Sequence, residues 1–288
     1  MKRHVIPVIS VCLLAACGGG SGDSSKYRLP GSITVNAYEG ETLRVRVQGS
    51  VAKKPRGTLS VQVTVDGTFF DPDVPEPYVD YEAMSMSVSL ELRPTLTADT
   101  YSTQIAVLIC EDDDCQSHEI PVTIHVAPDP QNPPTPANGD FSSGTTGWST
   151  ATFGGGAATL SAAAGELRVD MTSGGSNPSG WAAGAVQVVS PPINLVEGTR
   201  YRLSFRARAA STPRLIGASV SQGGDRDGDG SWPLYTYMET VNLTGTNATY
   251  TSAPFTMWET NRAANVTFYV GGSTADVYLD DVVVEEVP

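Results

Sequence analysis

The C-terminal half of the chain is framed by two short stretches, NGDF at residues 138–141 and VYLDDV at residues 277–282. A third stretch, GTRYRLSFRARA at residues 198–209, lies between them and alternates apolar with polar side chains. An alternation with a period of two is typical of a β-strand that has one buried face. The same period returns at residues 265–270. These patterns predict a domain built from β-sheet, without long helices.

The order and spacing of these stretches, with GW at residues 147–148, resemble carbohydrate-binding modules of the CenC type, which form families 4, 9 and 22. The resemblance covers nearly all of residues 137–288 and none of the chain before them. It implies a β-sandwich jelly roll that binds sugar without catalysis. Within the first motif, Trp148 is expected to pack in the core.

Alternation of apolar and polar residues also recurs from Ile33 to Val126, within a predicted domain of residues 27–127. The apolar members fall at residues 43–47, 59–65, 84–92, 101–109 and 120–126. About seven short strands in roughly 100 residues are typical of an immunoglobulin-like sandwich. We therefore predict an all-β protein in which an immunoglobulin-like sandwich is followed by a β-sandwich jelly roll at residues 137–288.

A proline-rich stretch, PDPQNPPTP at residues 128–136, joins the two predicted domains. Prolines at this density favour polyproline II, which is an extended and semi-rigid conformation. We predict a spacer that projects the second domain outward. A simple linker is compatible with the same composition.

The first residues are typical of a bacterial export signal. Lys2 and Arg3 precede an apolar run at residues 5–16, which is shorter than an ordinary membrane span. The run leads into LAAC at residues 14–17, which matches the lipoprotein cleavage box. Residues 1–16 are therefore predicted to be a signal peptide, and Cys17 is predicted to carry lipid such as palmitate. An ordinary secretory signal with a chance cysteine is the alternative.

The segment after the cysteine contains GGGSG, so residues 17–26 are expected to form a flexible tether. Gly18 stands where an aspartate would retain a lipoprotein in the inner membrane. We expect an exported, lipid-anchored protein, located at the outer membrane if the cell is Gram-negative.

The charge of the chain bears on its partners. The sequence has 18 Lys and Arg against 31 Asp and Glu, which gives a net charge of −13. Nucleic acid is not an expected partner, because binding phosphates requires clustered basic residues.

Apart from Cys12 in the predicted signal peptide and the lipid-bearing Cys17, the chain has two cysteines, Cys110 and Cys115. In an oxidising compartment they are expected to form a disulfide at the tip of a hairpin. The run EDDD at residues 111–114 is then expected to be exposed between them. A zinc site is the alternative, but the chain offers no second pair of thiols nearby.

The resemblance implies that the sugar lies across one face of a sheet, on aromatic rings and amide groups. A pyranose ring has an apolar C–H face that stacks on aromatic side chains, and its hydroxyls need donors and acceptors. Core packing is the alternative for each aromatic candidate, and Trp232, Tyr237 and Trp258 are weaker candidates for a loop rim. The implied sugar contacts are Phe153, Trp181, Gln187, Gln222, Tyr235, Asn265 and Tyr269.

The sequence DRDGDG at residues 225–230 matches the start of a calcium loop, with Asp225, Asp227 and Asp229 as metal ligands. Thr236 occupies the twelfth position, where an EF-hand requires a glutamate, so an EF-hand is excluded. The stretch either binds calcium as an isolated acidic loop or forms a solvated turn.

A second calcium position follows from the resemblance alone. Modules of this type often hold a structural calcium near the first strand, and Asp280 matches one of its ligands. Ser142 replaces the glutamate that the family commonly has after the opening phenylalanine. A structural Ca²⁺ ion is therefore an open expectation at this position.

Catalytic motifs are absent from the sequence. His118 and His125 are the histidines that remain after the signal, and no nucleophile elbow, phosphate loop or zinc box is present. We therefore predict a non-catalytic surface lipoprotein whose partners are a glycan, the membrane through its lipid anchor, and surface enzymes or proteins. One alternative is a structural or adhesion lipoprotein that contacts proteins. The other is a glycan-active enzyme, which requires two facing carboxylates.

Overall fold

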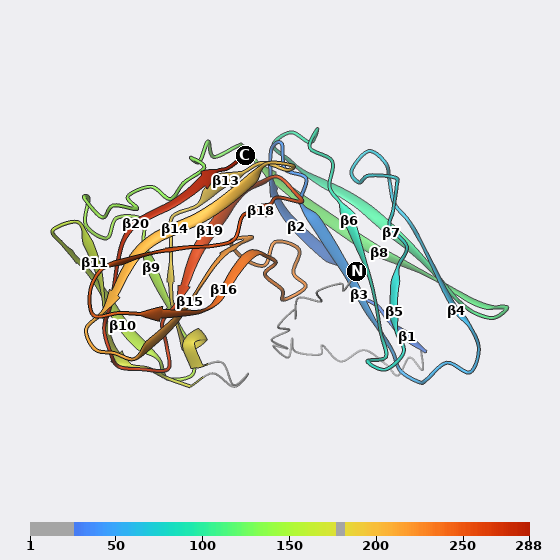
Figure 1. The fold of residues 1–288 in the computed structure, drawn as a ribbon. Coiled ribbons are helices and arrows are strands. Elements are labelled where there is room, and N and C mark those ends of the chain that lie inside the picture. Colours follow the sequence, from blue (N-terminus) through green and yellow to red (C-terminus); the bar gives the residue numbers. More distant parts are fainter. Residues whose placement is uncertain (1–25, 177–181) are drawn as a thin grey trace. The chain divides into compact units, whose positions relative to one another are not determined.

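The computed structural model describes residues 26–176 and 182–288, which form two compact units of β-sheet (Figure 1). The prediction of an all-β fold is confirmed. Among the described residues, no helix is long and apolar enough to cross a membrane. Of the described residues, 26–129 and 225–231 form the first unit, and 130–176, 182–224 and 232–288 form the second.

Two groups of predictions fall on residues that the structure does not describe. The predicted signal peptide and the lipid-bearing Cys17 lie outside the described residues, as does most of the tether. Trp181, one of the expected sugar contacts, also lies outside them.

The first unit contains two four-stranded sheets, with strand orders β1-β3-β6-β5 and β2-β8-β7-β4. Strand β2 runs parallel to β8, and the other pairs are antiparallel. The apolar members of the alternating runs form one buried cluster that draws on both sheets. The strands are β1 (Tyr27–Arg28), β2 (Ile33–Tyr38), β3 (Arg44–Val51), β4 (Leu59–Thr64), β5 (Tyr78–Asp80), β6 (Ser85–Glu91), β7 (Asp99–Glu111) and β8 (Asp114–Ala127).

The hairpin of β7 and β8 carries the predicted disulfide. Cys110 and Cys115 lie directly opposite each other in the ladder and are bonded, which confirms the pairing. The prediction that the whole acidic run is exposed is wrong for Glu111, which is buried. Its carboxylate forms an ion pair with Lys26 and accepts hydrogen bonds from the backbone N–H groups of Arg56 and Gly57.

The second unit contains two six-stranded sheets. One has the order β10-β11-β20-β14-β17 with β18 beside β14, and the other has the order β16-β15-β19-β12-β9 with β13 beside β19. The strands are β9 (Ser149–Thr152), β10 (Ala157–Ala163), β11 (Glu166–Ser173), β12 (Val186–Val189), β13 (Ile193–Leu195), β14 (Arg200–Ala209), β15 (Arg214–Ser221), β16 (Leu234–Leu243), β17 (Ala248–Thr251), β18 (Phe255–Thr256), β19 (Asn261–Tyr269) and β20 (Val277–Glu286). A short 3₁₀ helix, η1 (Ala182–Ala185), precedes β12.

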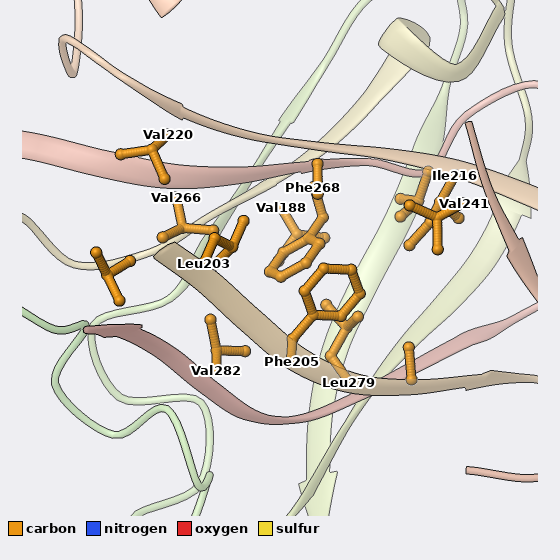
Figure 2. Close-up of a cluster of buried hydrophobic side chains, with 14 of the residues drawn as sticks. Val188, Leu203, Phe205, Ile216, Val220, Val241, Val266, Phe268, Leu279 and Val282 are labelled. Atoms are coloured by element: carbon orange, nitrogen blue, oxygen red, sulfur yellow. The ribbon is translucent and has the colours of Figure 1, made fainter. Parts of the chain in front are cut away.

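The core of the second unit lies between these two sheets (Figure 2). Val266 and Phe268 of β19 face Leu203 and Phe205 of β14, and all four side chains are buried. The rings of Phe205 and Phe268 meet edge to face, with centroids 4.9 Å apart. Burying a side chain of this size stabilises the fold by about 1.5–3 kcal/mol. The alternate residues of β19 must therefore point away from the core.

The NGDF stretch forms the turn that opens the second unit. The side chain of Asn138 accepts a hydrogen bond from the Ser143 N–H and donates one to the Gly144 carbonyl. Its backbone carbonyl accepts a hydrogen bond from the indole N–H of Trp148 at 3.1 Å. Trp148 packs on Phe141 in the core, as expected from the sequence.

The proline-rich stretch from Pro130 onward belongs to the second unit. The Val284 N–H donates to the Thr135 hydroxyl at 3.1 Å, and the Asn194 N–H donates to the Pro133 carbonyl at 2.9 Å. Part of this stretch therefore lies along the second unit, held by hydrogen bonds.

Candidate functional site

One outward face of the second unit gathers polar and aromatic side chains. It belongs to the sheet β16-β15-β19-β12-β9, on the side away from the core between the two sheets. The antiparallel register places these outward residues opposite one another across β12, β19, β15 and β16. We call this set the polar face: Gln187, Gly217, Ser219, Ser221, Tyr237, Asn265, Thr267 and Tyr269. Its members Gly217, Ser219, Ser221 and Thr267 are buried, and the partly exposed members are Gln187, Tyr237, Asn265 and Tyr269.

Two tyrosines form the centre of the polar face. The hydroxyl of Tyr269 lies 3.0 Å from the hydroxyl oxygen of Ser219. The ring of Tyr237 stands nearly perpendicular to that of Tyr269, with an interplanar angle of 85° and centroids 6.1 Å apart. Burial raises the pKa of both phenols, so both rings are neutral at physiological pH. The result is an aromatic corner of two rings.

An amide and two small hydroxyls adjoin the tyrosines. The side-chain oxygen of Asn265 accepts hydrogen bonds from the Ser221 hydroxyl at 2.9 Å and from the Thr267 hydroxyl at 3.4 Å. Gln187 lies across the ladder from Tyr269 on the neighbouring strand. The polar face thus carries both donors and acceptors beside its aromatic rings.

Large apolar side chains are exposed around the same sheet. Leu215 lies on β15 and Leu234 on β16, and Trp232 precedes Leu234 by two residues. Phe153 directly follows β9, and its N–H donates to the Ala185 carbonyl.

The outward face of the other sheet has a different chemistry. Its arginines are engaged with carboxylates: Arg202 with Glu285 at 2.7 Å, and Arg208 with Glu166 at 2.5 Å. The guanidinium of Arg208 also lies 3.6 Å from the centre of the Tyr278 ring. The arginines and carboxylates of this face bind one another, so fewer of their hydrogen-bonding groups are available to a ligand.

The structure brings some of the predicted sugar contacts together. Gln187, Asn265 and Tyr269 lie on the polar face, and Phe153 lies at the end of β9 in the same sheet. Tyr237, which the sequence suggested only for a loop rim, is part of β16 and contacts Tyr269. No period-two pattern marks its face in the sequence, because the register of β15 with β16 shifts on both sides of it.

Two other predicted contacts lie below the surface. Tyr235 is buried, and its hydroxyl donates to the carboxylate of Glu259 and accepts from the Asn261 side-chain amide. The same amide donates to the backbone carbonyl of Gln222 at 3.1 Å, and Gln222 is also buried. Both residues therefore belong to an internal polar cluster rather than to the polar face.

The acidic loop brings its three aspartates together. One carboxylate oxygen from each of Asp225, Asp227 and Asp229 lies within 4.8 Å of the others. Asp227 is buried and accepts a hydrogen bond from the Arg46 N–H at 2.7 Å. Burial, together with the carboxylates of Asp229 and Asp225, raises the pKa of Asp227 to about 7. One buried oxygen of Asp229 has no hydrogen-bond partner among the described residues.

This loop is held within the first unit by its arginine. The guanidinium of Arg226 pairs with the buried carboxylate of Glu41 at 2.6 Å and donates to the Asn36 carbonyl at 2.6 Å. It also lies 5.0 Å from the centre of the Tyr38 ring. A loop far along the sequence is thus built into the packing of the first unit.

Asp280 lies apart from these aspartates in the sequence and in its contacts. Its carboxylate is 3.6 Å from the guanidinium of Arg206, and burial raises its pKa. Within the described part of the chain, the only group of three or more potential metal ligands is the one formed by the Asp225–Ser231 loop.

Comparison with known proteins gives one family match. Residues 136–276 match the family model described as "Carbohydrate binding domain". No curated protein matches the chain. Among solved structures, the chain is similar to the K3 cleaved adhesin domain of Lys-gingipain from Porphyromonas gingivalis w83, with 16% identity and a TM-score of 0.34, over 50% of this chain and 95% of that chain.

Proposed function

We propose, from the match of residues 136–276 to the carbohydrate-binding domain family, that the protein is a lipid-anchored surface protein that holds polysaccharide without cleaving it. The observation that carries the proposal is the grouping of Tyr237, Tyr269, Gln187 and Asn265 on one outward sheet face. The polar face is the proposed ligand site.

The chemistry of the polar face suits a sugar. The ring faces of tyrosine stack on the C–H face of a pyranose, while amides and hydroxyls pair with its hydroxyl groups. Ser219 fixes the hydroxyl of Tyr269, so the ring is oriented before a ligand arrives. A preoriented ring reduces the entropy lost on binding.

The non-catalytic part of the proposal rests on the carboxylates of this face. Glycoside hydrolysis uses two carboxyl groups that flank the scissile bond. Glu239 of β16 provides one carboxylate beside Tyr237. The residues of the polar face include no Asp or Glu that could serve as the second carboxylate. Binding without hydrolysis is the activity that this set of side chains supports.

The anchoring part of the proposal rests on the sequence around Cys17. A lipid on this cysteine would keep the glycan-binding unit at the membrane surface, where it could supply polysaccharide to surface enzymes. Radiolabelled palmitate should enter the full chain expressed in a Gram-negative host, and the Cys17→Ser variant should not incorporate it. Equal labelling of both proteins would contradict the anchor.

We also propose that the Asp225–Ser231 loop binds a calcium ion. Three carboxylates within reach of one cation supply the oxygen ligands that Ca²⁺ prefers, and the ion would offset the cost of burying Asp227 in its charged form. Isothermal titration of the full chain with calcium chloride after chelator treatment tests this. Heat of binding that disappears in Asp225→Asn and persists in Asp113→Asn supports the site, and no heat with the wild type contradicts it.

The test of the central activity is a glycan array probed with the full chain, with and without calcium chelator. Retention on at least one polysaccharide supports the proposed function. Complete absence of binding under both conditions contradicts it.

A further inference from the structure

The polar face has a position without a side chain at its centre. Gly217 of β15 lies directly opposite Tyr269, and the register of β15 and β16 shifts at this point. Because Ile216 pairs with Val241 and Ala218 pairs with Met238, two residues of β16 lie opposite the single Gly217. Gly217 is buried, and a glycine within a strand often accompanies a bulge of this kind.

A carboxylate is placed beside this position. Glu239 is one of the two bulged residues of β16, is exposed, and lies two residues from Tyr237 on the same side of the strand. Its charge acts on that tyrosine: burial, then Tyr269 and Glu239, raise the pKa of the Tyr237 phenol. The carboxylate therefore adjoins the aromatic corner.

The carboxylate of Glu239 has no ion-pair partner in the part of the chain that the structure describes. The residues of the polar face include no Lys or Arg. On the other sheet of the unit, by contrast, Glu166 and Glu285 are each paired with an arginine. The ligand face thus combines an unpaired negative charge with two neutral aromatic rings.

Resting on the proposed function, we infer that Tyr237, Tyr269 and Glu239 form a subsite that selects the charge of the glycan. It takes an amino sugar, whose ammonium group pairs with Glu239 beside the tyrosine rings, and it rejects a uronic acid. A cation gains both the Coulomb attraction of the carboxylate and the attraction of an aromatic face. A sugar carboxylate instead meets a like charge with no cation to offset it.

The test uses three β-1,4-linked oligosaccharides of equal length that share one backbone: oligomers of glucosamine, of glucose and of glucuronic acid. Calorimetry with the full chain at about pH 5.5, where the glucosamine amines carry protons, should give about tenfold tighter binding to the glucosamine oligomer than to the glucose oligomer, which corresponds to about 1.4 kcal/mol. The glucuronate oligomer should give no measurable binding. High salt should reduce the preference for glucosamine, because exposed charges are screened.

Two variants separate the charge effect from folding. Glu239→Gln should lose the preference for glucosamine while its affinity for the glucose oligomer stays within about twofold. Glu286→Gln makes the same charge change at an exposed position of β20, on the other sheet, and should keep the preference. Both variants should match the melting temperature of the wild type.

Two results would overturn the inference. One is equal affinity of the wild type for all three oligomers, or binding to none of them. The other is a preference for glucosamine that survives in Glu239→Gln. The proposed function fails separately, only when the wild type binds no polysaccharide of the glycan array.

Discussion

The backbone N–H of Val282 donates to the carbonyl oxygen of Gly139 at 2.9 Å. This bond joins the stretch that opens the second unit to the stretch that ends it. The approach is close, because a Cβ added to Gly139 would lie 2.2 Å from the carbonyl oxygen of Val282. The glycine is therefore needed for the two ends of the unit to meet.

Gly139→Ala is expected to destabilise the protein by about 1–3 kcal/mol, because backbone must move to admit the methyl group. A loss of this size should lower the melting temperature of the unit by about 2–4 °C for each kcal/mol. Gly245→Ala is the matched control, since a Cβ there has nothing within 4 Å. Calorimetric melting of the two variants checks the prediction, and equal melting temperatures would contradict it.

The pair Arg208 and Glu166 predicts a pH-dependent contribution to stability. Hydrogen bonds from Arg208 lower the pKa of Glu166 in the folded chain. A depressed pKa stabilises the fold above the unfolded value, and the contribution disappears as the pH falls through the folded value. Glu166→Gln should therefore melt below the wild type at pH 7, and the difference should shrink below about pH 4. A difference that does not change between pH 7 and pH 3 would count against this account.

The Cys110–Cys115 disulfide closes a short hairpin loop and keeps the Glu111 side chain near its partners. In the chain-entropy model, a loop of this length contributes about 2 kcal/mol. The double variant Cys110→Ser, Cys115→Ser should melt at a lower temperature than the oxidised wild type. Reductant should lower the melting temperature of the wild type to that of the double variant. No shift in either experiment would show that the bond does not stabilise the fold.

The cation proposed for the acidic loop predicts a stability effect as well. Calcium should raise the melting temperature of the first unit, because a ligand that binds only the folded state stabilises it by mass action. The rise should be absent in Asp229→Asn and present in Asp113→Asn, an exposed aspartate of the same unit. An equal rise in both variants would show that calcium acts elsewhere.

Much of the fold follows from local sequence patterns. The period-two alternation of residues 201–207 and of residues 265–270 identifies strands β14 and β19 and separates their buried from their outward side chains. Trp148 and Phe141 follow from their motif. These signals are local, because each strand shows its own faces regardless of which strand lies beside it.

Other features depend on contacts between distant residues, which no local pattern reveals. Glu111 looks like part of an exposed acidic tip, yet Lys26 and the backbone near Gly57 enclose it. The loop around Arg226 looks like a solvated turn, yet its guanidinium pairs with buried Glu41. In both cases a charge is buried because a partner far along the chain is present.

The residues of the candidate site also include some that a local pattern predicts and some that depend on contacts with distant residues. Asn265 and Tyr269 could be assigned to one face from their own strand, and the structure places them there. Tyr237 joins them through the register of β15 with β16, which includes a bulge that the sequence does not announce. Tyr235, two residues away, turns inward to Glu259, at a second register shift of β15 and β16 between Val220 and Ser221.

The central claim is that the polar face, built around Tyr237 and Tyr269, binds the glycan. It is tested most directly by affinity electrophoresis of the full chain in gels that contain the polysaccharides retained on the array. Tyr237→Ala combined with Tyr269→Ala should abolish the retardation of the wild type, because the aromatic corner is lost. Tyr278→Ala, which removes a tyrosine from the other sheet, should remain retarded like the wild type. Retardation of the double variant equal to that of the wild type, with both proteins folded, would contradict the account.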